Sequence, residues 1–312
     1  MAWPLLLLLV GCGIIPHAVD YPEDTGQAWE IPAEYTDPAA LQVATFNASW
    51  LWSAYEDGYY PRNAVDYAMV ARLFRAFDLE LVALQEVNGD PAMELLGMAD
   101  EWSWSLGASG WSQNAGLLWR NDRVRVDNVR EIALEANEWP SKDPVAADVT
   151  ALDGSLAFTA VVVHFKPYAG NEDAAHRYTQ AEQLHAWITG ELALEEHRAP
   201  FHDHVMVLGD FNDAFTPLNS SYPSMEIWRD DPAFTVLTDG SPEFSQIPYR
   251  SLIDHIVVSE PLAEAWQPQG DGEGSAVIAH DEISPWADYS GGFSGRSNIS
   301  DHRPVWAYLA VD

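Results

Sequence analysis

Short apolar segments that stop at a polar residue recur along the chain from residue 41 onward. Their length and their content of Val, Leu, Ile and Phe are typical of buried β-strands. Several of them follow one another with no helical pattern between them, which favours mixed or antiparallel sheets over a doubly wound parallel sheet. We expect strands over Leu41–Asn47, Leu79–Glu86, Ala115–Trp119, Val145–Leu152, Leu156–Val163, His204–Leu208, Leu252–Val258 and Pro304–Leu309.

Local patterns place a hairpin and two helices. Asp153-Gly154 lies between two apolar runs and is a strong signal for a β-hairpin. Apolar residues recur at helical spacing between Pro61 and Phe77, which predicts an amphipathic helix. A second helix is expected over residues 174–194, broken at Gly190.

The chain is strongly acidic. Its 312 residues include 48 Asp and Glu but only 15 Lys and Arg, for a formal net charge of −33. The 14 Trp, 12 Tyr and 11 Phe nevertheless indicate a packed core and not a disordered chain. Only Lys142 and Lys166 are lysines, so the sequence has no broad basic patch to capture nucleic acid or anionic membrane. We interpret the acidic surface as a solvated face, such as an adaptation to salt.

The N-terminus resembles a bacterial lipoprotein signal. The apolar run Pro4–Val10 is far shorter than the roughly 20 residues that cross a bilayer, and it fits an export signal. Leu9-Val10-Gly11-Cys12 resembles a lipobox, and Cys12 is the single cysteine, which excludes an intrachain disulfide. We expect residues 1–11 to be a signal peptide and Cys12 to be lipidated, so that the exported protein is anchored in the bacterial cell envelope. No Lys or Arg precedes the apolar run, which leaves a secreted protein or a misplaced start codon as alternatives.

Two further segments follow the signal. Residues 12–40 contain four prolines among acidic residues, a composition that resists helix and strand and predicts an extended tether. Residues 41–312 contain no comparable linker and no repeat, so we expect a single domain there. We expect this domain to be monomeric.

Polar groups without a packing role stand at the ends of the expected strands. A carboxylate that ends an apolar strand is costly to bury unless it meets a cation or a hydrogen-bond donor. Several carboxylates at one sheet edge suggest a hard divalent cation bound by oxygen atoms, Mg²⁺ or Mn²⁺. A histidine beside them is a candidate general base. The residues are Asn47, Glu86, His164, Asp210, Asn212 and Asp254, with Asp301 and His302 before the last strand.

Six motifs resemble the endonuclease/exonuclease/phosphatase superfamily, which has the deoxyribonuclease I-like fold. They occur in the family's order, and the resemblance covers residues 41–310. It implies an α+β fold, a four-layer α/β sandwich in which two mixed, mainly antiparallel β-sheets pack face to face with helices outside. The active site is then expected at one edge of the sheets. The motifs are Thr-Phe-Asn, Gln-Glu-Val, His-Phe-Lys, Gly-Asp-Phe-Asn-Asp, Ile-Asp-His-Ile and Ser-Asp-His-Arg-Pro.

The resemblance implies a metal site that takes Mg²⁺ or Mn²⁺. Glu86 resembles the family's principal metal ligand, and Asn47 is expected close to the same metal. Asp301 resembles a further acidic ligand or a support for it. Ser49 stands where some members place an acid, which leaves open whether a second metal binds.

The resemblance also implies the catalytic groups. His302 resembles the base that deprotonates the attacking water, oriented by Asp254. Asp210 and Asn212 resemble the pair that positions the nucleophile and contacts phosphate oxygens. His164 resembles the donor that stabilises charge on those oxygens.

Basic and aromatic residues are candidates for substrate binding. Lys166 follows His164 by two residues and is expected to reach a substrate phosphate, with a surface salt bridge as the alternative. Arg177 lies on the second expected helix and is a candidate to line the site. Four tryptophans are expected in the core, with an aromatic substrate platform as the alternative. They are Trp102, Trp104, Trp111 and Trp119.

These features predict a metal-dependent phosphoesterase that hydrolyses phosphodiester bonds. The acidic charge counts against a nuclease, but a divalent cation can bridge an acidic protein to phosphate. No continuous exposed apolar run that could enter a lipid surface is visible after residue 41, so a nuclease or nucleotide-type activity ranks first. A sphingomyelinase-like phospholipid phosphodiesterase is the alternative, and it would use the apolar segment Trp50-Leu51-Trp52 to enter the lipid surface. A phosphatase and a non-catalytic binding module are further alternatives. A decayed binding module would have lost at least one catalytic residue, and none is missing.

Overall fold

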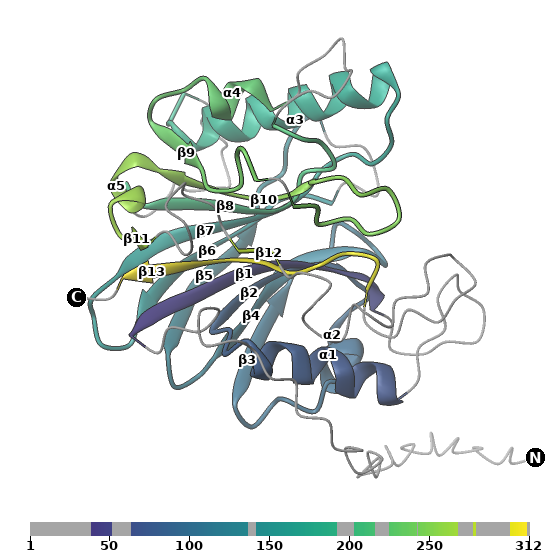
Figure 1. Ribbon diagram of the computed structural model, residues 1–312, viewed down its shortest axis with the longest axis vertical. Helices are drawn as coiled ribbons and strands as arrows, with labels where there is room; N and C mark the ends of the chain where they lie inside the picture. The colour runs from purple at the N-terminus through teal and green to yellow at the C-terminus, as the bar shows by residue number, and fades with distance from the viewer. Residues whose placement is uncertain are drawn as a thin grey trace, which may run out of the picture.

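The computed structural model describes residues 39–51, 64–136, 142–191, 203–215, 225–241, 243–267, 277–278 and 300–310. In these ranges two β-sheets lie face to face, and helices cover their outer faces (Figure 1). The expected four-layer α/β sandwich is therefore confirmed.

The first sheet has seven strands in the order β11-β13-β1-β2-β4-β3, with β12 also pairing β13. β1 and β2 run parallel, and the other pairs are antiparallel. Its strands are β1 (Ala40–Leu51), β2 (Leu81–Val87), β3 (Trp102–Leu106), β4 (Asn114–Arg120), β11 (Trp266–Gln267), β12 (Val277–Ile278) and β13 (Val305–Ala310).

The second sheet has six strands in the order β5-β6-β7-β8-β10-β9. Here β7 and β8 run parallel, and the other pairs are antiparallel. Both sheets are thus mixed and mainly antiparallel, as expected. The strands are β5 (Val124–Glu131), β6 (Val145–Ala151), β7 (Ala157–His164), β8 (Val205–Asp210), β9 (Phe234–Val236) and β10 (Asp254–Ser259).

Helices lie on both outer faces of the sandwich. The first sheet is covered by α1 and α2, and the second sheet is covered by α3 and α4 (Figure 1). The short α5 follows β10 directly. The helices are α1 (Ala64–Ala76), α2 (Asp90–Glu94), α3 (Asn171–Ile188), α4 (Glu226–Arg229) and α5 (Glu260–Ala263).

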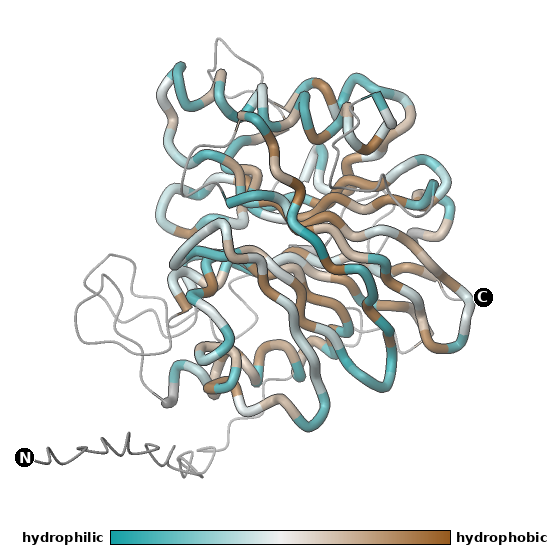
Figure 2. Tube along the Cα trace, turned by 180° about the vertical axis from the view of Figure 1, so that it is seen from behind, coloured by the Kyte–Doolittle hydropathy of each residue, from teal (hydrophilic) through white to brown (hydrophobic). Residues whose placement is uncertain are grey.

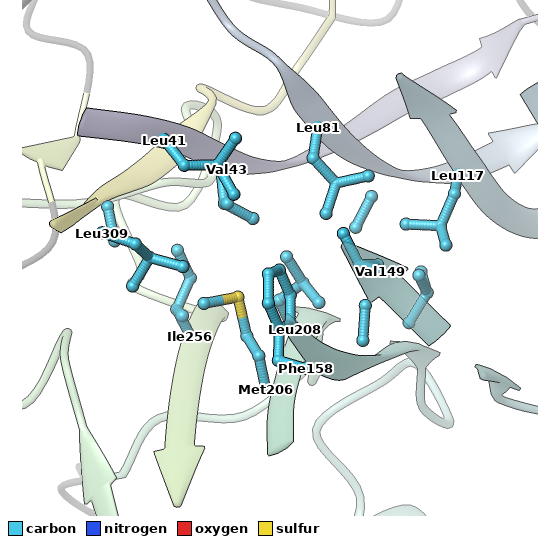
Figure 3. Close-up of a cluster of buried hydrophobic side chains, with 14 of the residues drawn as sticks. Leu41, Val43, Leu81, Leu117, Val149, Phe158, Met206, Leu208, Ile256 and Leu309 are labelled. Carbon is cyan, nitrogen blue, oxygen red and sulfur yellow. The ribbon is translucent and has the colours of Figure 1, made fainter. Parts of the chain in front are cut away.

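Three apolar layers hold these elements together. The layer between the sheets is built from inward-facing side chains of both sheets, such as Val43, Leu117, Phe158 and Leu208 (Figure 3). A second layer joins α1 to the first sheet, and a third joins α3 and α4 to the second sheet. Hydrophobic residues accordingly concentrate in the central strands, while the outer loops are hydrophilic (Figure 2). A rigid, doubly covered scaffold of this kind fixes the strand ends on which the site residues stand.

The expected elements are present, with shifts at their ends. The hairpin of β6 and β7 forms, and Gly154 adopts the left-handed φ of 80° that its turn requires. The helix expected from residue 174 begins at Asn171 and ends at Ile188, before Gly190. Five strands were not expected: β3, β5, β9, β11 and β12. The β5 strand is interrupted by an irregularity in its pairing between Asp127 and Arg130, which weakens its alternating pattern.

The core assignment of the four tryptophans is wrong for one of them. Trp102 is buried, and Trp104 and Trp119 pack against the apolar layers. Trp111 instead lies in the loop between β3 and β4, outside the strands that form the apolar layers, and is exposed.

The expected signal peptide 1–11, the lipidated Cys12, most of the tether 12–40, and Trp52 lie outside the described residues. Among the residues that are described, no helix has the length and apolar character needed to span a bilayer.

Candidate active site

Strand direction gathers the predicted site residues at one edge of the sandwich. The parallel pairs β1–β2 and β7–β8 end at this edge, and their antiparallel partners β13 and β10 begin there. We call it the site edge, and the other end of the strands the opposite edge. The residues gathered there are Asn47, Glu86, His164, Asp210, Asn212, Asp254, Asp301 and His302.

A buried histidine–aspartate pair forms the centre of the site. His302 Nδ1 lies 2.7 Å from Asp254 Oδ2, and both side chains are buried. Burial alone would lower the pKa of His302, but the Asp254 carboxylate raises it well above its usual value. Ser300 holds the loop that carries His302, because its hydroxyl accepts the His302 N–H and donates to the Asn47 carbonyl oxygen 2.6 Å away. The geometry is that of an imidazole with a fixed orientation and a raised basicity.

Asp210 brings a second buried carboxylate to the same place. It pairs with Asp254 in the β8–β10 register, and its oxygens accept hydrogen bonds from Asn47 Nδ2 at 2.9 Å and from the Asn212 N–H at 2.8 Å. Burial and the neighbouring Asp254 charge raise the pKa of Asp210 to about 7. Ligand atoms of Asp210, Asp254 and His302 all lie within 4.8 Å of one another.

Two of these residues adopt strained backbone conformations. Glu86 and Asn212 have left-handed φ angles of 60° and 54°, which cost about 1–3 kcal/mol each in non-glycine residues. The strain of Asn212 is held by its side chain, which donates to the Phe165 carbonyl oxygen at 3.0 Å. Glu86 is held by the Trp50 N–H, which donates to Oε2 at 3.1 Å. Such strain is typical of functional sites, where the surrounding structure fixes a side chain that would otherwise turn away.

Lys142 joins the site, although no sequence motif pointed to it. Its Nζ lies 3.4 Å from His164 Nε2. Burial and the Lys142 charge lower the pKa of His164 well below its usual range, so this imidazole is neutral. Burial also lowers the pKa of Lys142, while the charges of Glu86 and Asp210 oppose that change. One signal in the sequence could have pointed to Lys142: the chain has only two lysines. Both of them stand in loops of the site edge.

The donor set suits a hard divalent cation. Burial raises the pKa of Glu86, and the nearby Asp301 charge raises it further, so these carboxylates gain from a cation between them. The buried Oδ1 of Asp254 has no hydrogen-bond partner. Asn47 lies beside both carboxylates, because its Nδ2 donates to Glu86 at 3.4 Å and to Asp210 at 2.9 Å, and its Oδ1 accepts the Ser49 N–H. In this arrangement Asn47 positions the carboxylates.

The two expected substrate-binding cations have different surroundings. The guanidinium of Arg177 is buried and bonds to Asp213 and to the carbonyl oxygens of Lys166 and Tyr168. Arg177 therefore shapes the loop after β7, and its contacts do not support the expected role in lining the site. Lys166 donates its backbone N–H to Gln180, and its ammonium group has no ion pair with any described residue. The expected surface salt bridge of Lys166 is thus not seen among these residues.

This fold and this cluster of carboxylates and histidines define a phosphoesterase of one family. The chain belongs to the Endonuclease/Exonuclease/phosphatase family, whose sequence model matches residues 44–302. Members of this family are phosphoesterase hydrolases and typically depend on a divalent metal.

Solved structures share the fold at low sequence identity. The human Nocturnin catalytic domain with bound sulfate anion superimposes with a TM-score of 0.59 at 16% identity, covering 88% of this chain and 94% of that one. A Bacteroides thetaiotaomicron mannosyl-6-phosphatase gives 0.56 at 15%, covering 86% and 99%. D. rerio TDP2 complexed with single strand DNA product gives 0.55 at 15%, covering 86% and 98%. No curated protein matches the sequence.

Proposed function

We propose that this protein is a Mg²⁺- or Mn²⁺-dependent hydrolase of phosphodiester bonds in which His302 deprotonates the attacking water. One observation carries the proposal: the buried His302–Asp254 pair, 2.7 Å apart, lies against the Asp210 carboxylate. A structural histidine would not need two buried carboxylates beside it. Burying these charged groups together costs stability, and such clusters are typical of functional sites.

The other residues act on the phosphate and the water. Glu86 and Asp301 would hold the cation, which when bound supplies a Lewis acid for the phosphoryl oxygen. Asp210 and Asn212 position the water and the phosphate. Neutral His164 can donate a hydrogen bond to a phosphoryl oxygen.

Lys142 and Lys166 are two cations available at the site edge. The Lys142 ammonium group faces Glu86 and Asp210 and can neutralise part of the negative charge that gathers when a phosphate approaches. Lys166 stands on the loop after β7 and is partly exposed. We propose that Lys166 binds the substrate at a point outside the reacting centre.

The direct test is hydrolysis of a small activated diester, bis(p-nitrophenyl) phosphate. We expect turnover to stop with a chelator and to return with Mg²⁺ or Mn²⁺. Glu86→Gln should abolish this metal response, while Glu101→Gln, at an exposed carboxylate of the opposite edge, should keep it. Turnover that is indifferent to the chelator would refute the metal role.

Among substrates, we place nucleic acid or nucleotides first, with phospholipid phosphodiesters and phosphomonoesters as alternatives. The fold neighbours support no single choice, since one is a phosphatase of a sugar phosphate and another holds a DNA product. Plasmid DNA, single-stranded RNA, sphingomyelin vesicles and soluble phosphomonoesters assayed in parallel would decide. Cleavage of vesicles alone, lost on Trp50→Ala with Trp52→Ala, would favour the lipid alternative.

We also propose that the protein is exported and anchored in the bacterial cell envelope through a lipid on Cys12. The lipobox-like sequence before the single cysteine supports this. Mass spectrometry of the membrane fraction should find a chain that begins at Cys12 and carries acyl groups. A soluble secreted chain with an unmodified Cys12 would contradict it.

A further inference from the structure

Three aromatic side chains project into solvent. Tyr168, Trp111 and Tyr249 are 74%, 71% and 69% exposed, whereas the other exposed large apolar side chains among the described residues, Leu152 and Tyr178, are 53% and 38% exposed. Aromatic rings gain much free energy from burial, so an exposed group of them needs an explanation. Such groups commonly mark binding surfaces.

All three stand on loops of the site edge. Trp111 lies between β3 and β4, Tyr168 follows β7, and Tyr249 precedes β10. The loop of Tyr249 is joined directly to the catalytic residues, because the Ile247 N–H donates to the Asp301 carbonyl oxygen at 2.9 Å. The exposed rings therefore border the active site.

Two of the rings are held outward by a fixed backbone. Trp111 and Tyr168 have left-handed φ angles of 58° and 82°, an unfavourable conformation for aromatic residues. Side-chain donors hold both peptide groups: Asn114 Nδ2 lies 3.1 Å from the Trp111 carbonyl oxygen, and Arg177 Nη1 lies 2.6 Å from that of Tyr168. The loops are thus preorganised to present these rings.

The strand order places the loops that carry the rings around the catalytic residues. The loop of Trp111 leads into β4 and the loop of Tyr168 follows β7, and these two strands pack across from each other. The loop of Tyr249 leads into β10, which packs against β13. β8 lies between β7 and β10 in its sheet and ends at Asp210. A polymer that reached from the loops of β4 and β7 to the loop before β10 would cross the end of β8.

Each tyrosine has a cation beside it in the sequence. Lys166 precedes Tyr168 by two residues. Arg250 follows Tyr249, and its guanidinium lies 4.2 Å from the ring centroid of Phe244. Stacking surfaces that alternate with single cations fit a chain of bases linked by phosphates.

We propose that Trp111, Tyr168 and Tyr249, the aromatic rim, bind unpaired bases of single-stranded nucleic acid on both sides of the phosphodiester to be cleaved. This inference rests on the proposed phosphodiesterase activity. Base stacking does not depend on charge, so it can work in a chain of net charge −33 that cannot rely on counterion release. A duplex hides its base faces, and a lipid surface would require a continuous apolar patch, whereas these rings stand on three separate loops.

The test compares binding with and without each ring. Fluorescence anisotropy of a labelled single-stranded 12-mer is measured in chelator on the full chain carrying His302→Ala, so that turnover is not needed. We expect Trp111→Ala, Tyr168→Ala and Tyr249→Ala each to weaken binding by about 5- to 150-fold, the scale of one stacked base. Tyr168→Phe should restore most of the binding, because it keeps the ring.

Matched controls are the other exposed apolar side chains, Tyr178→Ala on α3 and Leu152→Ala at the opposite edge. Both should bind the strand as the parent does. The inference is overturned if the rim variants bind the strand as well as the controls, or if duplex binding falls by the same factor. It is also overturned if the rim variants lose only their binding to sphingomyelin vesicles. Loss of strand binding in a protein that hydrolyses no diester would uphold the rim and refute the proposed activity.

Discussion

Charged residues have different partners at the two edges of the sandwich. At the opposite edge, Arg120 pairs with Asp78 at 2.6 Å and with Asp122 at 2.8 Å, and Arg123 pairs with Glu80. Each of these carboxylates thus has an arginine partner.

At the site edge, buried carboxylates face one another, and among the described residues Lys142 is a cation whose charge acts on them. Asp210 is buried against Asp254, and the charges of Glu86 and Asp301 oppose each other. Paired charges at one edge contribute to folding, whereas the excess of negative charge at the other opposes it. The difference teaches that the site edge is built for a bound cation and substrate at the expense of stability.

The largest effect should come from the base. His302→Ala should lower turnover of the small diester at least about 100-fold, the usual scale for loss of a general base. Arg120→Ala, at the opposite edge, should leave turnover near the parent value while circular dichroism shows both proteins folded. Near-normal turnover of His302→Ala would mean that another group activates the water.

The partner of the base should shift the pH profile. Asp254→Asn should lower turnover less than His302→Ala does, because the imidazole is still present. Since the Asp254 carboxylate raises the pKa of His302, its removal should move the acid limb of kcat/KM to lower pH. If the acid limb did not move, the ionisation that it reports would belong to a group other than His302.

Metal should stabilise the site edge in a pH-dependent way. Asp210 has a pKa raised to about 7, so the folded, metal-free protein binds more protons than the unfolded chain between pH about 4 and 7. Stability from this group is present at low pH and is lost as the pH rises through about 7. Burial also raises the pKa of Glu86, so at low pH protons compete with Mg²⁺ for these carboxylates. Mg²⁺ should therefore raise the free energy of unfolding more at pH 8 than at pH 5.5, by up to about 2.7 kcal/mol at 100 times its Kd, and the Tm should rise with it.

Glu80 provides the comparison within the same experiment. Burial raises its pKa to about 7 as well, although Arg123 and the Gln42 N–H oppose this. Glu80→Gln should flatten the pH dependence of the Tm but leave the Mg²⁺ response intact. An equal Mg²⁺ response at both pH values would contradict binding at the carboxylates of the site edge.

Breaking a pair at the opposite edge should cost stability and not activity. Arg123→Ala leaves the buried Glu80 carboxylate without its guanidinium, so urea unfolding should show a loss of about 1–3 kcal/mol. Arg125→Ala removes an exposed pair with Asp127 and should cost less than about 1 kcal/mol. Equal losses in the two variants would mean that burial of Glu80 is irrelevant.

The smallest effect is expected for Lys142. Lys142→Met keeps the aliphatic stem and removes the charge, and turnover should fall about tenfold, as for the loss of one charge-assisted hydrogen bond. The metal-free variant should unfold at lower urea concentration than the parent, because Glu86 and Asp210 then lose the positive charge of Lys142. Unchanged turnover and unchanged stability would place Lys142 outside the site.

Much of the site could be predicted because its residues end regular strands. An apolar run that stops at Glu86 or Asp210 reveals both the strand and the residue at its end. Lys142 could not be found in this way, since it ends no strand and its place beside His164 depends on the tertiary structure. For Arg177 the helix was foreseeable, but the direction of the guanidinium depends on the carbonyl oxygens of a distant loop. The exposure of Trp111 likewise depends on which elements cover its loop.

The pairing of the last strand with the first has a consequence for how the protein is made. β13 lies beside β1, and the Ser300 hydroxyl reaches the Asn47 carbonyl oxygen across 253 positions of sequence. The sheet that carries Asn47 and Glu86 therefore stays incomplete until β13 has been synthesised. His302 arrives with that final strand, so a nascent or truncated chain has neither a finished first sheet nor its base. A nascent chain that has not reached β13 should therefore lack the proposed activity, which protects the cell from hydrolysis by partly synthesised copies.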